Sequence, residues 1–197
     1  MKKNIKGFTL VELLAAIIVL GVISVFAIPH ILGLLSGSRN KIYVSDARKL
    51  IAQAEYKIRA DNTGIERPEP NDCIVMSLAY LDNADFDVAP NGGDYQRENS
   101  FVVIKNNGGQ LEYAVTLVEK TSKGTYFGLE LISEKLLIDE ATEHITSFAE
   151  GDLMNANTGI TKDEINQRLA GYLPGEIVAI YSNPDISDEY AFDANNT

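Results

Sequence analysis

One long apolar segment limits what this chain can fold into more than any other feature. Residues 8–35 contain only two ionisable side chains, Glu12 and His30. As an α-helix this segment would be about 42 Å long, whereas the hydrocarbon core of a bilayer is about 30 Å thick. The segment therefore predicts a transmembrane helix. The basic residues before it favour a cytoplasmic N-terminus, which places the rest of the chain outside; they are Lys2, Lys3 and Lys6.

A cleavable secretory signal peptide is the main alternative for this segment. The three lysines would form its basic region, and Val25-Phe26-Ala27 is a tolerable cleavage site that would release a chain starting at Ile28. Glu12 argues against this alternative, because a carboxylate in the membrane centre is costly and gives a signal peptide no benefit. A plainer role for Glu12 stays open, since the helix macrodipole favours a negative charge near the N-terminus.

The first part of the chain resembles a known family. The string KGFTLVELLAAIIVLGVISVFAIP is similar to the class III signal and assembly helix of type IV pilins and pseudopilins, and the resemblance covers about the first 55 residues. It implies that a prepilin peptidase cuts between Gly7 and Phe8, removes residues 1–7 as a basic leader peptide and N-methylates Phe8.

The resemblance also gives Glu12 a role in subunit assembly. Its carboxylate is expected to pair with the amino terminus of Phe8 in a neighbouring subunit. A charge pair about 4 Å apart, at an effective dielectric constant near 20, gains about 4 kcal/mol before the cost of desolvation. This gain is large enough to favour one axial register of a filament. Glu12 and Phe8 are therefore the predicted assembly residues.

Pro29 predicts an irregularity in the helix. Proline removes one backbone hydrogen bond and crowds the carbonyl four residues earlier, here that of Val25. With Gly33 nearby, we expect a bend or local melting, and the resemblance implies an unwound stretch around such a proline in the filament. A simple kink is an equal alternative.

Residues 36–62 predict an amphipathic continuation of the same helix, because apolar residues recur there at helical spacing. Asn62-Thr63-Gly64 predicts its end. The apolar face needs a covering surface, which the head at residues 63–197 would supply. This face consists of Ile42, Ala47, Leu50, Ile51, Ala54 and Ile58.

The head is predicted to be of the α+β class, with an antiparallel sheet. Residues 101–105, 110–118 and 125–132 are β-rich, and the connections between them are typical of hairpins. A long helix laid against such a sheet is the type IV pilin-like plan. The side chains expected to face the helix are Val103, Tyr113, Val115, Leu117, Phe127, Leu129 and Leu131.

The sequence patterns in the rest of the head are less regular. Residues 65–100 predict a long loop, with a short helix possible near 73–81. Two extra C-terminal helices are expected at 133–148 and 161–169, the second of which starts with a capping-box sequence. Residues 176–181 predict a further strand, followed by a polar tail from Asn183.

Charge and composition exclude several kinds of function. The formal net charge is −11, and residues 63–197 carry 24 acidic and eight basic side chains. Such a surface repels nucleic-acid phosphates, so we expect no direct nucleic-acid binding. The single cysteine, Cys73, excludes an intramolecular disulfide and is expected to be a small buried hydrophobe, although pairing with another chain stays open.

No motif for catalysis or a cofactor is present, so we expect neither an enzyme nor a cofactor. Two histidines and one cysteine leave little for a nucleophile with its base. Two acidic clusters could hold calcium, although a solvated loop is the better interpretation and no metal is expected. These clusters are Asp82, Asp85 and Asp87, and Asp185, Asp188 and Glu189.

The leading hypothesis is a structural subunit of a type IV pilus-like surface filament for adhesion, motility or biofilm formation. It would be a single-pass protein of the cytoplasmic membrane before it assembles outside the cell. Its partners would be copies of itself or other pilins, the prepilin peptidase and the inner-membrane assembly machinery. The alternatives are a pseudopilin of a type II secretion or DNA-uptake system, and a secreted or membrane-anchored binding protein that does not polymerise.

Overall fold

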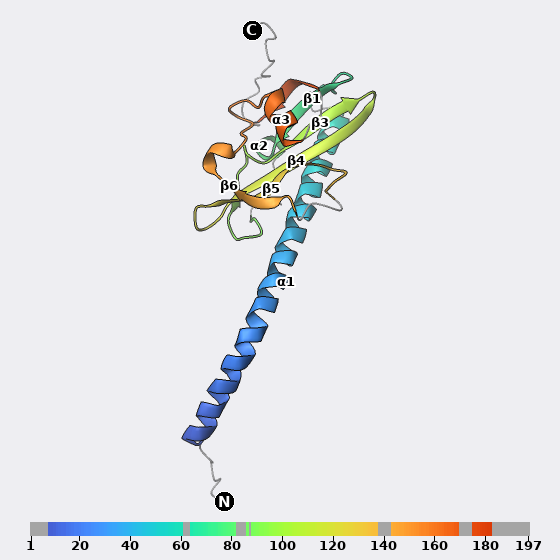
Figure 1. Cartoon of the computed structure of the whole chain (residues 1–197). Helices are drawn as coiled ribbons and strands as arrows, with labels where there is room; N and C mark the ends of the chain where they lie inside the picture. Colours follow the sequence, from blue (N-terminus) through green and yellow to red (C-terminus); the bar gives the residue numbers. More distant parts are fainter. Residues whose placement is uncertain are drawn as a thin grey trace, which may run out of the picture. The chain divides into compact units, whose positions relative to one another are not determined.

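The structure is a computed structural model, and it divides the chain into two compact units, Met1–Arg39 and Asn40–Thr197 (Figure 1). It describes residues 8–60, 64–81, 86, 88–137, 143–169 and 175–182, except the side chains of residues 27–33. Helix α1 (Leu10–Arg59) contributes to both units. Each unit is described by itself below.

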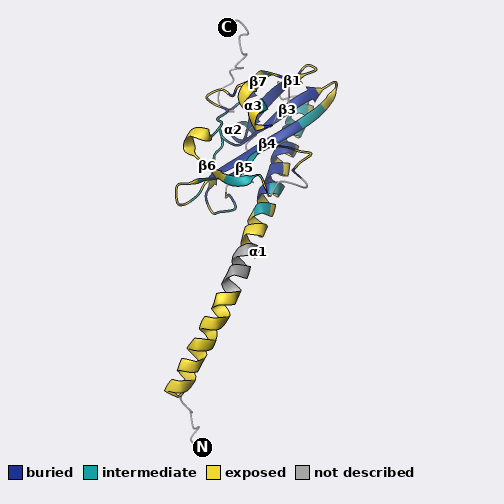
Figure 2. Cartoon of the chain, in the orientation of Figure 1, coloured by how far each residue is buried: buried dark blue, intermediate teal, exposed yellow. Residues whose placement is uncertain are grey.

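The first unit consists of the N-terminal part of α1, and its surface is apolar. Every described side chain from residue 8 to 26 and from 34 to 39 is exposed (Figure 2). Ile17, Leu20 and Phe26, for example, are 60%, 63% and 69% exposed. In the described part of the chain, no helix is both long enough and apolar enough to cross a membrane.

The second unit begins with the amphipathic part of α1. Tyr43, Ala47, Leu50 and Ala54 are fully buried there, which confirms the predicted periodicity. The helix ends at Arg59, slightly before the predicted stop, and residues 61–63 lie outside the described residues. Ile42, predicted on the apolar face, is instead 43% exposed.

The head contains one sheet in the order β6-β5-β4-β3-β1-β7, in which β2 (Asp94–Tyr95) also pairs with β4. β1 and β7 are parallel, and the other pairs are antiparallel. The remaining strands are β1 (Asp72–Ser77), β3 (Phe101–Asn107), β4 (Gln110–Lys120), β5 (Tyr126–Ser133), β6 (Ile145–Phe148) and β7 (Glu176–Tyr181). The short helices are α2 (Leu78–Leu81), η2 (Glu150–Asp152) and α3 (Lys162–Arg168).

The three predicted central strands are confirmed as β3, β4 and β5. The strand β7 is also confirmed, as is α3, whose N-cap Thr161 forms the predicted capping box with Glu164. The tail from Asn183 lies outside the described residues.

The prediction of a long loop over 65–100, with a short helix possible near 73–81, is wrong for Asp72–Ser77, although α2 (Leu78–Leu81) lies within the range given for the helix. The segment Asp72–Ser77 is a strand between β3 and β7, and five of its six residues are buried. A strand covered on both faces is continuously apolar, and periodicity cannot separate such a run from a buried helix.

The helix predicted at residues 133–148 is also wrong. Residues 134–137 form turns, with the Leu137 N–H donating to the Ser133 carbonyl, and β6 pairs antiparallel with β5. Residues 138–142 lie outside the described residues. Leu136 and Leu137 had suggested helical spacing, but only Leu137 is buried.

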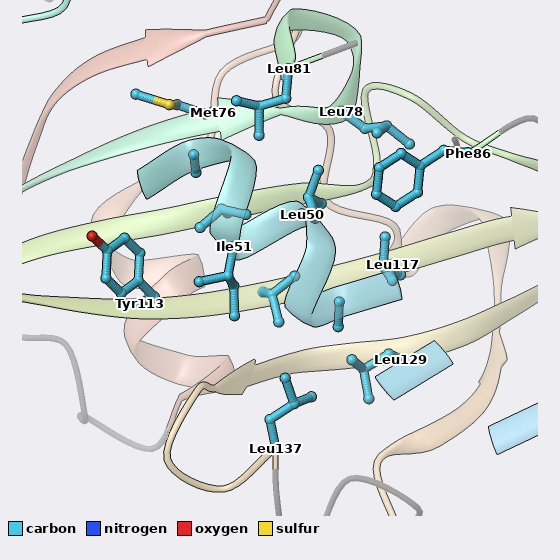
Figure 3. Close-up of a cluster of buried hydrophobic side chains, with 14 of the residues drawn as sticks. Leu50, Ile51, Met76, Leu78, Leu81, Phe86, Tyr113, Leu117, Leu129 and Leu137 are labelled. Atoms are coloured by element: carbon cyan, nitrogen blue, oxygen red, sulfur yellow. The ribbon is translucent and has the colours of Figure 1, made fainter. Parts of the chain in front are cut away.

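The sheet has a buried core on each face. The helix-side core joins Leu50 and Ile51 of α1 to side chains such as Met76, Leu117 and Leu129 (Figure 3). The opposite core joins Ile165 and Leu169 to Val75, Val103 and Leu131. Helix α1 therefore covers one face of the sheet, and the α3 region covers the other.

Val103 and Leu131 do not belong to the helix-side core, contrary to the prediction. Val103 lies in the opposite core, while its neighbours Val102 and Ile104 lie in the helix-side core. The pairing of β5 with β4 is irregular between Val115 and Leu117 of β4, where β5 has one extra residue. Such a bulge places two residues opposite one and reverses the alternation of side chains. For Leu131, the prediction assumed an unbroken alternation along β5. For Val103, it assigned the wrong face, because Val102 and not Val103 pairs with Val115.

Candidate functional site

Candidate assembly site at the start of α1

A capping box fixes the first turn of α1. The Glu12 carboxylate oxygen Oε2 accepts hydrogen bonds from the backbone N–H and the hydroxyl of Thr9, both 2.9 Å long. In return, the Glu12 N–H donates to the Thr9 hydroxyl oxygen at 3.3 Å. Thr9 precedes the first helical residue, so this arrangement satisfies backbone donors that the helix itself leaves unpaired.

The capping box holds a carboxylate next to Phe8. Phe8 is 85% exposed and is covalently bonded to Thr9, the residue that binds Glu12. Among the described residues, no hydrogen bond is formed with the second carboxylate oxygen, Oε1. The site can therefore present a fixed, solvent-accessible negative charge to a donor on another molecule.

The role of Thr9 was missed, although the sequence contained its signal. Thr9-Leu10-Val11-Glu12 has the spacing of a capping box before an apolar run. Glu12 was predicted as a partner for an amino group, and a favourable position near the helix N-terminus was left open, but its bonds to Thr9 were not foreseen. The structure shows its role within its own chain, where it completes the capping box of α1 with the N-cap residue Thr9.

The other predicted site residues of this segment are placed as follows. Gly7, the residue before the predicted cut, lies outside the described residues. The backbone is helical at Pro29 and Gly33, within α1, while the Pro29 side chain is not described. The bend or local melting expected in the helix at Pro29, with Gly33 nearby, stays a prediction, as does the unwound stretch that the resemblance implies in the filament.

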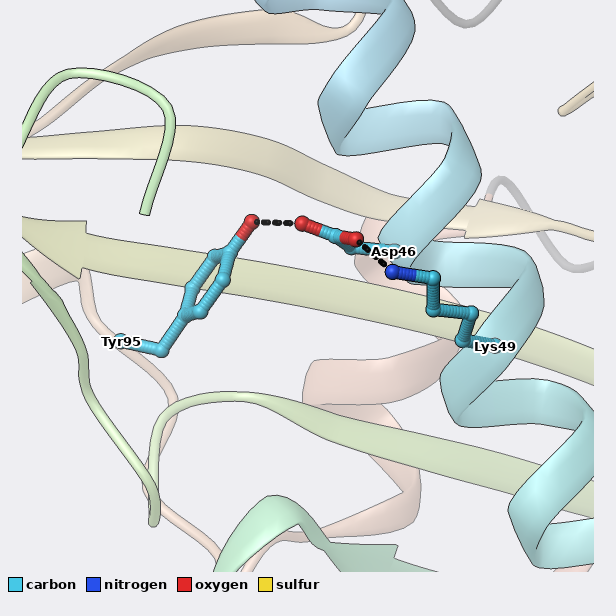
Figure 4. Close-up of polar contacts among 3 residues, drawn as sticks. All are labelled: Asp46, Lys49 and Tyr95. Carbon is cyan, nitrogen blue, oxygen red and sulfur yellow. Dashed lines mark hydrogen bonds and ion pairs between the residues drawn. The ribbon is translucent and has the colours of Figure 1, made fainter. Parts of the chain in front are cut away.

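A polar contact attaches α1 to the head (Figure 4). The buried carboxylate of Asp46 accepts a hydrogen bond from the Tyr95 hydroxyl at 2.9 Å, and its other oxygen lies 3.1 Å from Lys49 Nζ. Burial and the nearby Asp46 raise the pKa of Tyr95, so the hydroxyl keeps the proton that it donates. This contact was missed because Asp46 was counted only as a charge.

A second contact attaches the loop before β2 to the same part of α1. The side-chain amide of Asn91 donates to the Tyr43 hydroxyl at 3.1 Å, and its backbone N–H donates to Glu119 at 3.2 Å. The rings of Tyr43 and Tyr95 pack edge to face, with centroids 6.3 Å apart. The loop, β4 and α1 therefore form one packed unit.

The described head offers little that indicates catalysis or metal binding. No group of three or more metal-ligating side chains occurs in the part of the chain that the structure describes. Cys73 is buried, and burial raises the pKa of its thiol to about 11. The acidic side chains of both predicted clusters, within 82–87 and 185–189, fall on residues that the structure does not describe.

Comparison with known proteins identifies the N-terminal segment. Residues 2–28 match the family model described as the prokaryotic N-terminal methylation motif. No curated protein and no solved structure was found to match the chain. The matched residues contain the capping box and the exposed apolar side chains of α1 up to Phe26. The chain therefore carries, at residues 2–28, the class III signal peptide of type IV pilins and pseudopilins.

Proposed function

We propose that this chain is a structural subunit of a type IV pilus-like filament and polymerises through the N-terminal part of α1. The observation that carries the proposal is the methylation motif, which coincides with a helix whose described apolar side chains are all exposed up to Phe26. The proposed role is structural and involves no catalysis.

The exposed apolar surface of α1 is expected to be buried against lipid or against another protein. Burying apolar surface gains roughly 25 cal/mol per Å², and large exposed apolar patches mark interaction sites. Before assembly, the membrane would cover residues 8–35. In the filament, the same segment of neighbouring subunits would replace the lipid. The side chains concerned include Leu10, Leu13, Leu14, Ile17, Ile18, Val22, Ile23, Val25 and Phe26.

Glu12 supplies what the apolar contacts lack, which is a fixed axial register. Cleavage by a prepilin peptidase between Gly7 and Phe8 would create a new amino group on Phe8. In our proposal, Glu12 of one subunit holds Thr9 of its own chain through Oε2 and binds the methylated amine of a neighbour's Phe8 through Oε1. The interaction energy of a charge pair that is shielded from water depends strongly on the distance between the charges. One axial register of the filament is therefore more stable than the others.

The test is whether long external fibres contain this chain. Fibres sheared from cells that express the chain with a pilus assembly system are purified and identified by mass spectrometry. We expect this chain as a stoichiometric component. A chain found only in the membrane, in short assemblies that do not leave the cell surface, indicates the pseudopilin alternative. A soluble monomer contradicts polymerisation.

A further inference from the structure

One face of α1 in the second unit carries an exposed aromatic side chain between two cations. Tyr56 is 73% exposed. At 3.6 residues per turn, Lys49, Ala52 and Arg59 lie within about 60° of Tyr56 around the helix axis. The side chains of Lys49 and Arg59 are 52% and 72% exposed. We call these four residues the Tyr56 face.

A groove of about 300 Å³ lies on the same unit, beside the edge strand β7. Apolar side chains from β1 and β7 line it, among them Ile74, Val178 and Ile180, and Val178 is 39% exposed. Glu66 and Glu69 in the segment before β1, with Asp72 at the first position of β1, add an acidic rim. We call this site the β7 groove.

The rim of the β7 groove is acidic in spite of Arg67. The Arg67 guanidinium donates to the Gly109 carbonyl at 2.7 Å, across to the β3–β4 hairpin. Glu176 adds a further acid next to the rim, because it pairs with Asp72 in the parallel register of β1 and β7. The groove therefore fits an apolar group that carries positive charge beside it.

The Tyr56 face has these properties. Tyrosine is amphipathic and, with arginine, is enriched among the residues that dominate interface energies. The groove lies at the small end of ligand pockets, which span roughly 300–1,000 Å³, so it suits one large side chain. Lys49 and Arg59 also form ion pairs in their own chain, with Asp46 and Glu55. Both side chains stay more than half exposed beside the ring, where their charge complements the acidic rim. The chain's own residues 183–197 carry four acidic and no basic side chains, so their charge does not complement the acidic rim.

We propose that the Tyr56 face of one copy docks in the β7 groove of the next copy. The face and the groove are different surfaces of one chain, so each copy offers its face to one neighbour and its groove to another. Such heterologous contacts continue along a filament when they do not close into a ring. This inference rests on the proposed polymerisation and adds a contact between heads to it.

Disulfide formation between differently tagged chains tests the contact. Both chains carry Cys73→Ser, one carries Tyr56→Cys and the other Val178→Cys, and they are co-expressed and assembled into fibres. Oxidation is expected to give a heterodimer that contains both tags. Ser122→Cys, in the exposed β4–β5 turn, replaces Val178→Cys as the matched control and is expected to give none.

The outcomes separate this inference from the proposed function. Fibres that contain both chains but no heterodimer overturn the contact. Absence of fibres from the unsubstituted chain overturns the proposed polymerisation, and the contact with it. The unassembled Val178→Cys chain is also treated with a thiol reagent, with and without residues 183–197. If the introduced thiol reacts only after these residues are deleted, the tail occupies the groove and the inference is wrong.

Charge reversal provides a test that introduces no cysteine. Glu66→Lys together with Glu69→Lys is expected to lower the fibre yield several-fold, and Arg59→Glu in that background is expected to restore it. Arg168→Glu, on α3, is the matched control and is expected to restore nothing. A fibre yield that is unaffected by the rim substitutions contradicts the inference.

Discussion

Thr9 and Glu12 are joined by three hydrogen bonds at the start of α1, two of them accepted by the same carboxylate oxygen of Glu12. The pair caps the helix within one chain. It also fixes a negative charge beside Phe8, whose amino group is created only by the proposed cleavage. The same carboxylate can therefore serve the monomer as a cap and the polymer as a charge partner, and substitutions can separate these roles.

Substitutions at Glu12 separate its charge from its cap. Gln keeps a capping box because its amide oxygen can accept the same hydrogen bonds, but it removes the charge. We expect Glu12→Gln and Glu12→Ala both to reduce sheared fibres strongly while cleavage after Gly7 continues. Thr9→Ala loses the cap, at a cost of about 1 kcal/mol, and is expected to keep most fibres. Normal fibres from Glu12→Gln would show that capping, rather than charge, is the contribution of Glu12.

The Asp46–Tyr95 hydrogen bond is expected to stabilise the second unit. Tyr95→Phe leaves the ring in place but removes a hydrogen bond to a buried carboxylate, which costs about 1.5–3 kcal/mol. Urea unfolding of the full chain in detergent measures this loss. Tyr126→Phe is the matched control, because its hydroxyl makes an exposed contact of 3.4 Å with Glu150 and should contribute much less. Equal losses for the two variants would contradict the proposed role of the Asp46–Tyr95 bond.

Cys73 is expected to be unreactive in the folded chain. Its Sγ lies 3.4 Å from the Glu176 carbonyl oxygen, and burial raises its pKa from 9.0 to about 11. At pH 8 we expect a thiol reagent to label it slowly in the native chain and rapidly in urea. Because the unfolded thiol loses its proton first, this group's contribution to stability is present below about pH 9 and is lost as the pH rises towards about 11. Rapid native labelling would place Cys73 at the surface.

Gly93 is expected to tolerate no side chain. A Cβ atom there would lie 2.0 Å from the carbonyl oxygen of Lys120, where β2 pairs with β4. Gly93→Ala should therefore destabilise the chain by about 1–3 kcal/mol or more, as overpacking does. Gly151→Ala meets no atom within 4 Å and is the control, with little expected loss. A native-like midpoint of thermal unfolding for Gly93→Ala would show that the β2–β4 pairing is wrong.

The sequence predicted those elements of the fold that depend on neighbouring residues, and it failed for those that depend on distant ones. The capping box of α3 and the hairpins around β4 depend on neighbouring residues, and both were predictable. The strand β1 is defined by pairing with β3 and with β7, which lies about a hundred residues later, so its apolar run alone was ambiguous. The Leu131 side chain changes face because of a bulge that only the register reveals.

The candidate site divides in the same way. Glu12 and Phe8 were identified from the motif, whereas the bond between Thr9 and Glu12 could also have been predicted from its spacing but was missed. The contact of Asp46 with Tyr95 joins residues 49 positions apart and has no local signal. The β7 groove is lined by residues within 66–74 and 178–181. No sequence pattern indicates that these two segments lie together.

The central claim is that a chain cut between Gly7 and Phe8 polymerises through its N-terminal helix. Mass spectrometry of the N-terminal peptide from purified fibres tests this claim most directly. The account predicts that the peptide starts at Phe8 and carries one N-methyl group. Fibres or membranes that contain only an intact Met1, or a mature chain that starts at Ile28, would contradict it.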